Sequence, residues 1–280
     1  MTPSPDAAAI IELAVRPRLG EFAERPFVLG ICGAQGSGKS TVAARVEANM
    51  AAIGVRVAML SLDDLYWPRE ERERLAREVH PLLRTRGVPG THDVALGWSV
   101  IDSLGRSGTT AIPRFDKALD TRRPVTAWPA VEGPIDLLLF EGWCVGAMPQ
   151  PDEALVAPVN ELERRQDVDG RWRRGVNAAL GSVYRALFER IDMLVLLAAP
   201  DTDIVLRWRT EQERALAQRL AETGLAGTVV MDDDALAMFV QYYERLTRHI
   251  LAEMPGRADL TIRLDRERRV TDVMPSPNYT

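Results

Sequence analysis

A glycine-rich segment with a single lysine carries the most specific chemistry in the sequence. Residues 33–41 read GAQGSGKST, and Gly33, Gly38, Lys39 and Ser40 fill the pattern GxxxxGK[ST]. Glycines let successive backbone N–H groups turn inward, and a following helix adds the positive end of its dipole, so the two form a cradle for a triphosphate. In such a cradle the lysine is catalytic, since it bridges the β- and γ-phosphates, and the serine hydroxyl holds Mg²⁺. The residues predicted to bind ATP here are Gly33, Ala34, Gln35, Gly36, Ser37, Gly38, Lys39, Ser40 and Thr41.

Three carboxylates that follow apolar segments could serve phosphoryl transfer. Asp63 and Asp64 come after the run 55–62, and Glu141 ends the run 135–141. The carboxyl ends of parallel strands meet at one edge of a sheet, where a carboxylate can accept a proton from a hydroxyl or ligate Mg²⁺. The paired aspartates could instead cap the helix that follows them. We predict that Asp63 is the catalytic base and that the Mg²⁺ ligands are Ser40, Asp63 and Glu141.

Cations gather in two turn-rich segments that could bind an anionic acceptor. RTRGVPGTHD (84–93) and IPRFDK (112–117) carry arginines, a histidine and Lys117, one of two lysines among 35 basic residues. An arginine can hold a carboxylate through two parallel hydrogen bonds, and Asp93 or His92 could bond the hydroxyl groups of the same molecule. Lysine offers a compact point charge, so its use in an arginine-rich chain favours a contact with an anion. A solvated surface charge is the alternative for each arginine.

Apolar runs that alternate with helical segments predict the scaffold for these groups. The runs cover residues 27–32, 55–62, 135–141, 191–199 and 258–264. The expected helices are 39–51, 70–79, 92–104, 177–190, 202–222 and 234–253. Short continuous apolar runs are typical of strands buried on both faces, and their alternation with helices indicates right-handed crossovers. The predicted fold class is α/β, a P-loop NTPase fold with a mostly parallel five-stranded sheet and helices on both faces.

The chain is expected to form one large domain. Its 280 residues exceed the usual ~150 per domain, but α/β units of ~250 residues are common. A short amphipathic segment ends at Pro26, so residues 1–26 are interpreted as a helical lead-in and residues 27–280 as a single kinase domain. Residues 143–175, with Pro, Gly and mixed charge, are expected to form an irregular insertion near the active edge.

Composition excludes several classes of protein. With 46% hydrophobic and 27% charged residues, the chain is neither disordered nor fibrous. A net charge of −5 with interleaved signs argues against nucleic-acid binding by charge, and the missing NKxD motif argues against a GTPase. The two cysteines lack CxxC spacing, and no basic leader or run of ~18 apolar residues is present, so we expect a cytoplasmic protein without membrane or nucleic-acid partners.

With these residues in view, the chain resembles the D-glycerate 3-kinases of the plant and fungal type. These belong to the P-loop kinases, together with uridine kinase, phosphoribulokinase and bacterial pantothenate kinase. The resemblance covers roughly residues 27–250. Besides the cradle, it is carried by SLDDLYW (61–67), HPLLRTRGVPGTHD (80–93), IPRFDK (112–117), LLLFEGWCVGAMP (137–149) and MDDDALAMFVQYY (231–243).

The resemblance implies an ATP- and Mg²⁺-dependent kinase that phosphorylates the 3-hydroxyl of D-glycerate. It also implies a helical lid at about residues 201–230, whose Arg207 and Arg209 contact ATP unless they belong to an ordinary solvated helix. The chain departs from the family where it reads ALDTRRP (118–124), so either Arg122 or Arg123 takes the place of the family's arginine. The residues expected at the acceptor are Asp64, Tyr66, Arg84, His92, Asp93, Arg114, Lys117, Arg122 and Arg123.

Two alternatives stay open at this point. One is a kinase of the same fold that acts on a nucleoside, on pantothenate or on another sugar acid. The other is a nucleotide-binding regulatory protein that hydrolyses ATP slowly as a switch. Only the first would leave a phosphorylated small molecule as its product.

Overall fold

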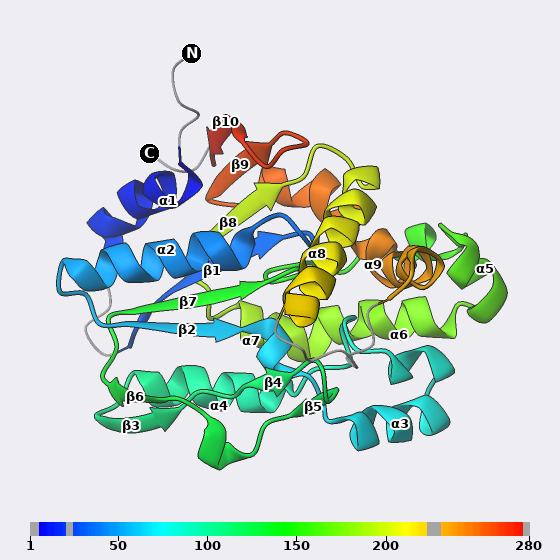
Figure 1. Ribbon diagram of the computed structural model, residues 1–280, viewed down its shortest axis with the longest axis horizontal. Helices are drawn as coiled ribbons and strands as arrows, with labels where there is room; N and C mark the ends of the chain where they lie inside the picture. The colour runs from blue at the N-terminus through cyan, green and yellow to red at the C-terminus, as the bar shows by residue number, and fades with distance from the viewer. Residues whose placement is uncertain (1–5, 21–24, 223–230, 277–280) are drawn as a thin grey trace.

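A six-stranded sheet forms the centre of the computed structural model, which describes residues 6–20, 25–222 and 231–276 (Figure 1). The spatial order of its strands is β10 (Val270–Pro275), β9 (Leu260–Leu264), β8 (Met193–Ala198), β1 (Phe27–Gly33), β7 (Leu137–Gly142) and β2 (Val57–Ser61). The five predicted strands are parallel, as expected, and β10 pairs antiparallel with β9 at one edge. The arrowheads of β7 and β2 point toward α8 (Asp203–Glu222) in Figure 1.

The short and exposed strands were not predicted. In β10, Val270 is buried, whereas Thr271 and Asp272 are exposed, so the strand lacks the continuous apolar run that marks a central strand. The pairing of four further strands into two small hairpin sheets was not predicted either, because these strands are two to four residues long. These sheets pair β3 (Gly108–Ala111) with β6 (Ala130–Gly133), and β4 (Phe115–Asp116) with β5 (Thr121–Arg122).

Alternate side chains of the parallel strands enter two separate cores. In β1, Phe27, Leu29 and Ile31 lie in one core, and Val28 and Cys32 lie in the other. All five are buried because helices cover both faces of the sheet. The first core is closed by α1 (Ala7–Val15), α2 (Lys39–Ala52) and the start of α8. The second is closed by α4 (Val94–Leu104), α7 (Arg185–Phe188) and α9 (Asp233–Glu253).

Most helices agree with the predicted segments, but the stretch between β7 and β8 differs. The segment expected as irregular contains α5 (Glu161–Gln166) and the start of α6 (Arg171–Ala179). α6 continues through a π-helical turn (Leu180–Tyr184) into α7, which breaks the single helix expected at 177–190. The polar residues that suggested a loop are caps: Asn160 accepts the Glu163 N–H of α5, and Asp167 accepts the first N–H groups of α6. α3 spans Arg69–Glu78, as predicted within one residue.

The N-terminal helix is attached to the sheet domain through α2. Glu12 on α1 accepts a hydrogen bond from Asn49 at 2.7 Å, and Asp6 pairs with Arg45 at 2.6 Å. Four stretches of the predicted regions lie outside the described residues. They are 1–5 and 21–24 of the lead-in, 223–230 of the lid and 277–280 of the domain. None of the described helices is both long and apolar enough to cross a membrane.

Candidate active site

The loop between β1 and α2 has the backbone of an anion cradle. Gly36 and Gly38 have φ angles of +80° and +86°, in the left-handed region that glycine enters without strain. The Ser37 N–H donates to the Ala34 carbonyl at 3.1 Å and closes the turn. α2 begins at Lys39 without a side-chain cap, so its first N–H groups are open to an anion. The predicted cradle thus lies between a strand and a helix, as triphosphate binding requires.

Two polar side chains of this loop are buried without partners among the described residues. They are the Gln35 amide, through both Nε2 and Oε1, and the Ser37 hydroxyl. A buried polar group without a hydrogen bond is costly, so these atoms are suited to meet a polar ligand. Lys39 is half-buried, and Ser40 and Thr41 are exposed at the start of α2.

Ser40 and Glu141 fit a Mg²⁺ ion. β1 pairs with β7 so that Ile31 lies opposite Glu141, which places this acid beside the cradle. The Ser40 hydroxyl donates to Glu141 Oε1 at 3.2 Å. Glu141 is 5% exposed, and its Oε2 has no hydrogen-bond partner in the part of the chain that the structure describes. A buried, unpartnered carboxylate oxygen favours a cation, and hydroxyl and carboxylate oxygens are ligands that Mg²⁺ prefers.

The adjacent strand brings the two aspartates to the same edge. β2 pairs with β7 so that Ser61 lies opposite Glu141. A 3₁₀ turn (Leu62–Leu65) follows at once and carries Asp63 and Asp64. The two acids therefore do not cap α3, the helix that follows, which begins at residue 69.

Asp63 is an ionised hydrogen-bond acceptor. Its Oδ1 accepts from the Tyr66 hydroxyl at 2.8 Å, and its Oδ2 lies 2.6 Å from Lys117 Nζ. Burial favours the neutral carboxyl, but the charges of Lys117 and Lys39 outweigh this effect and hold the pKa of Asp63 well below its usual range. Asp63 in turn raises the pKa of Lys117. The side chain of Lys117 is 61% exposed, so its ammonium group is accessible to a ligand.

Asp64 holds the segment that carries Lys117. Its Oδ1 accepts from the Phe115 N–H at 2.9 Å, and its Oδ2 pairs with Arg114 at 3.2 Å. Burial raises the pKa of Asp64. Both carboxylate oxygens and the Arg114 guanidinium are thus engaged within the protein, and Asp64 is better suited to position the 114–117 segment than to contact the acceptor.

Asp64→Asn is expected to lower the free energy of unfolding while it lowers turnover only slightly. The amide keeps the oxygen that accepts from Phe115 but loses the ion pair with Arg114, a charge-assisted contact of about 1–2 kcal/mol. Turnover should fall by less than about 10-fold, because Asp63 and the cradle are untouched. Urea denaturation and steady-state kinetics measure the two effects. A loss of turnover larger than that of Asp63→Asn would show that Asp64 is the reactive acid.

The two arginines of the ALDTRRP segment have different environments. Arg122 is 15% exposed and pairs with Asp93 at 3.1 Å, while it also donates to the Leu65 and Tyr66 carbonyls. Asp93 caps α4 by accepting the Leu96 N–H at 3.0 Å. The pair therefore joins the aspartate-bearing turn to α4. Arg123 is 53% exposed and lies 3.5 Å from Asp116, so it is the more accessible of the two to a ligand.

His92 offers a buried hydrogen-bond donor near Asp63. Its Nδ1 lies 2.6 Å from the Tyr184 hydroxyl, which accepts the Gly90 N–H at 3.0 Å. In the tautomer in which the Tyr184 hydroxyl donates to Nδ1, the ring proton of His92 is on Nε2. Burial lowers the pKa of His92 to about 3, so the ring is neutral. Nε2 has no partner among the described residues, and the ring stacks on Tyr66, whose hydroxyl bonds Asp63.

A buried arginine that the sequence did not reveal joins the 84–93 segment to the ALDTRRP segment. Arg72 is 2% exposed, pairs with Asp120 at 2.7 Å and donates to the carbonyl of Arg84 at 2.6 Å. Arg86 pairs with the same aspartate. Arg72 lies in REERERLARE, a helix so rich in charge that no local signal separates it from its exposed neighbours. The Arg84 side chain is exposed.

The lid arginines are paired along α8. Arg207 is 51% exposed and lies 3.1 Å from Glu211, and Arg209 pairs with Glu213. Between them, Trp208 is fully buried and packs against Gly36 of the cradle. The first turns of α8 therefore contact the nucleotide loop, and the two arginines flank that contact.

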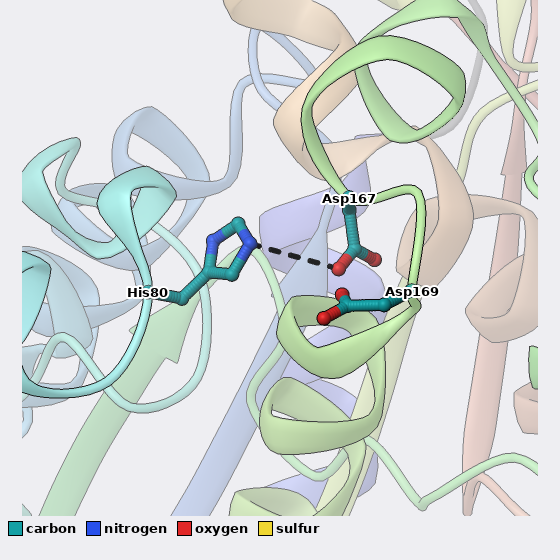
Figure 2. A group of neighbouring side chains, drawn as sticks. All are labelled: His80, Asp167 and Asp169. Atoms are coloured by element: carbon teal, nitrogen blue, oxygen red, sulfur yellow. Dashed lines mark ion pairs between the residues drawn. The ribbon is translucent and has the colours of Figure 1, made fainter.

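A cluster outside this site looks like a metal centre but has a structural role. His80, Asp167 and Asp169 lie close together (Figure 2). Both carboxylate oxygens of Asp167 accept backbone N–H groups of α6, and Oδ2 also pairs with Arg173 at 2.9 Å. His80 Nδ1 accepts the Leu82 N–H. The cluster therefore anchors α6 to the segment after α3.

Comparison with known proteins shows that the chain is related to kinases. Residues 28–150 match the phosphoribulokinase / uridine kinase family. The chain is 34% identical over 230 residues to an uncharacterized kinase of Schizosaccharomyces pombe, a match that covers 78% of this chain and 79% of that protein. It is 30% identical over 258 residues to the chloroplastic D-glycerate 3-kinase of Arabidopsis thaliana, covering 87% of this chain and 53% of that protein.

A solved structure shares the fold. D-glycerate 3-kinase from Cryptococcus neoformans superposes with a TM-score of 0.78 at 23% identity, covering 97% of this chain and 100% of that chain. The P-loop between strand and helix and the acids at the neighbouring strand ends thus occur in a chain whose relatives are kinases. The chain belongs to the phosphoribulokinase / uridine kinase family of P-loop kinases and is an ATP-dependent kinase homologous to D-glycerate 3-kinase.

Proposed function

We propose that the protein transfers the γ-phosphoryl group of MgATP to the 3-hydroxyl of D-glycerate. The observation that carries the proposal is the accessible ammonium group of Lys117, 2.6 Å from the ionised Asp63. This pair combines an acceptor for a hydroxyl proton with a cation for an anionic substrate. A relative that is 30% identical to this chain over 258 residues is named a D-glycerate 3-kinase, which supports the same acceptor.

The reaction needs orientation more than it needs a strong base. The substrate hydroxyl oxygen bonds to the γ-phosphorus, the bond from that phosphorus to the β–γ bridging oxygen breaks, and ADP leaves. In a loose transition state the hydroxyl proton departs late, so Asp63, with its low pKa, would first accept a hydrogen bond that aims the oxygen and would take the proton as the new O–P bond forms. Lys39 would stabilise the transferring group. Mg²⁺, held by Ser40 and Glu141, would neutralise phosphate charge when bound.

The surroundings of Asp63 suit a small hydroxy acid. Glycerate carries one carboxylate, and the cation beside Asp63 that is available for it is Lys117. Arg84 and Arg123, whose side chains are exposed, are further candidates from the neighbouring segments. The neutral His92 supplies an Nε2–H donor for a substrate oxygen. A nucleoside carries no negative charge, so it would need neither an ammonium group nor a guanidinium to neutralise one.

An ADP-release assay across a panel of acceptors tests the proposal. D-glycerate, L-glycerate, uridine, pantothenate and gluconate are compared at saturating MgATP, and the product is identified by ³¹P NMR. We expect D-glycerate to give the highest kcat/KM and 3-phosphoglycerate as product. Faster turnover of uridine or pantothenate would assign another acceptor. Release of inorganic phosphate with every compound, and no phosphorylated product, would identify a regulatory ATPase instead.

Lys117→Met is expected to act on the acceptor and not on ATP. Loss of a charge-assisted contact worth about 1.5–3 kcal/mol should lower kcat/KM for D-glycerate by roughly 10- to 150-fold. The Kd of ATP should change by less than about twofold, because the cradle and α2 are intact. Steady-state kinetics with D-glycerate varied at saturating ATP measure the first quantity, and fluorescence titration measures the second.

The matched control for this variant is Arg106→Met, which removes a cation that is 72% exposed and pairs with Asp102 in another part of the surface. It should leave kcat/KM unchanged. An unaltered acceptor kcat/KM in Lys117→Met would remove the lysine from the acceptor site. A loss confined to ATP affinity would assign it to the nucleotide.

A further inference from the structure

The turn between β9 and β10 is built around one aspartate. Asp265 Oδ1 accepts the N–H groups of Glu267 at 2.9 Å and Arg269 at 2.8 Å, and the Asp265 N–H donates to the Arg269 carbonyl at 2.9 Å. Within this turn Arg268 has a φ of +65°, a conformation that is uncommon for a residue with a side chain. The turn thus fixes the direction in which the Arg268 side chain leaves the backbone.

The Arg268 guanidinium reaches the nucleotide loop and the lid helix together. Its Nε donates to the Gly36 carbonyl at 2.5 Å, although the two residues are 232 positions apart in the chain. Its Nη2 lies 2.8 Å from Glu211 Oε2 on α8. The guanidinium carbon also lies 5.1 Å from the centre of the Trp208 ring. One side chain therefore joins the cradle, α8 and the C-terminal hairpin.

Trp208 closes the same contact from the side of α8. Its Nε1 donates to the Arg266 carbonyl of the turn at 2.8 Å. A Cβ added at Gly36 would lie 2.5 Å from Trp208 Cβ, so the loop and the helix touch with no space for a side chain. We call Gly36, Trp208, Glu211 and Arg268 the Arg268 junction.

The hydrogen bond from Arg268 fixes one side of the Gly36–Ser37 peptide. A peptide unit is planar and trans, so the Ser37 N–H points the other way, where it donates to the Ala34 carbonyl at 3.1 Å. The two hydrogen bonds together hold this peptide, and loss of Arg268 would let the turn that leads to the open N–H groups of α2 change its shape.

We propose that Arg268 is a positioning residue of the nucleotide site, which holds the Gly36 peptide in its phosphate-binding orientation and ties it to the lid helix. The ligand that depends on it is a nucleoside triphosphate. The inference rests on the ATP-binding part of the proposed function and is independent of the acceptor. It explains why the C-terminal hairpin, far from any sequence motif, is packed against the cradle.

The test compares Arg268→Ala with Arg268→Lys in the full chain, by titration with a fluorescent ATP analogue and by kinetics at varied ATP. Arg268→Ala should raise the Kd of the analogue and the KM of ATP by about 10-fold or more, as expected for loss of one charge-assisted hydrogen bond. Arg268→Lys keeps a charged donor and should restore part of the affinity. The KM of the acceptor should change by less than about twofold.

The matched control is Arg263→Ala, on β9 of the same hairpin. This side chain is 55% exposed and contacts Asp272 and Met274. It should bind the analogue like the wild type. Urea denaturation confirms that each variant is folded at the assay temperature. An unchanged Kd in folded Arg268→Ala, or equal losses in Arg268→Ala and Arg263→Ala, would overturn the inference. If D-glycerate is not phosphorylated but Arg268→Ala still weakens binding, the proposed acceptor fails and the inference stands.

Discussion

Lys39→Ala is expected to abolish phosphoryl transfer in a protein that remains folded. Lys39 is the first residue of α2, half-buried at the cradle, and contributes charge rather than core packing. Its loss removes the cation that would stabilise the transferring phosphoryl group, and turnover should fall by more than about 10³-fold. Coupled assays of ADP release measure the loss, and circular dichroism with urea denaturation measures folding.

Arg45→Ala on the same helix is the control for this variant, because Arg45 is 58% exposed and pairs with Asp6 on α1. It should keep normal turnover despite the loss of one cation. Near-normal turnover in folded Lys39→Ala would contradict the assignment of the loop as the site of phosphoryl transfer. A parallel loss in both variants would point to a general effect of charge.

Asp63→Asn is expected to lower turnover by about 10²- to 10⁴-fold while ATP still binds. The amide has nearly the same size and can keep the hydrogen bond from Tyr66. It cannot pair with Lys117 or accept strongly from a substrate hydroxyl, so the acceptor oxygen is no longer oriented. Single-turnover kinetics with prebound ATP separate this chemical step from nucleotide binding.

The comparison with Asp64→Asn makes this prediction specific. Both variants remove one negative charge from the same 3₁₀ turn, but Asp64 is bonded to Phe115 and Arg114, and Asp63 faces Lys117. Asp63→Asn should therefore lose more turnover. Asp64→Asn should lose more stability relative to its loss of turnover. The reverse order would mean that the reactive carboxylate lies one residue further along the chain.

The nucleotide half of the site could be predicted because its features are local. Gly36, Gly38 and Lys39 act within one short loop, and the strand before them and the helix after them are visible as an apolar run and an amphipathic pattern. Glu141 and Asp63 could be predicted as neighbours since parallel strands end at one edge. The five parallel strands follow from the same reasoning.

The acceptor half could be predicted only as a set of candidates. Arg122 and Arg123 are adjacent in sequence, but Arg122 is 15% exposed and pairs with Asp93, whereas Arg123 is 53% exposed beside Asp116. Likewise Asp64 accepts a hydrogen bond from the segment that carries Lys117. Which charged residue of such a segment is engaged depends on partners 29 and 51 positions away, and no local pattern records those partners.

What the sequence by itself determined is the chemistry of the phosphate cradle and the order of strands and helices that present it, because both depend on short-range backbone preferences and on the periodicity of apolar residues. The tertiary structure alone decided which polar side chains face each other. It brought Lys117 to Asp63, placed the Tyr184 hydroxyl against His92 Nδ1, and brought Arg268 to Gly36, 232 positions away in the chain. Charged groups are placed by pairing and desolvation between distant segments, and these energies exist only once the chain has folded.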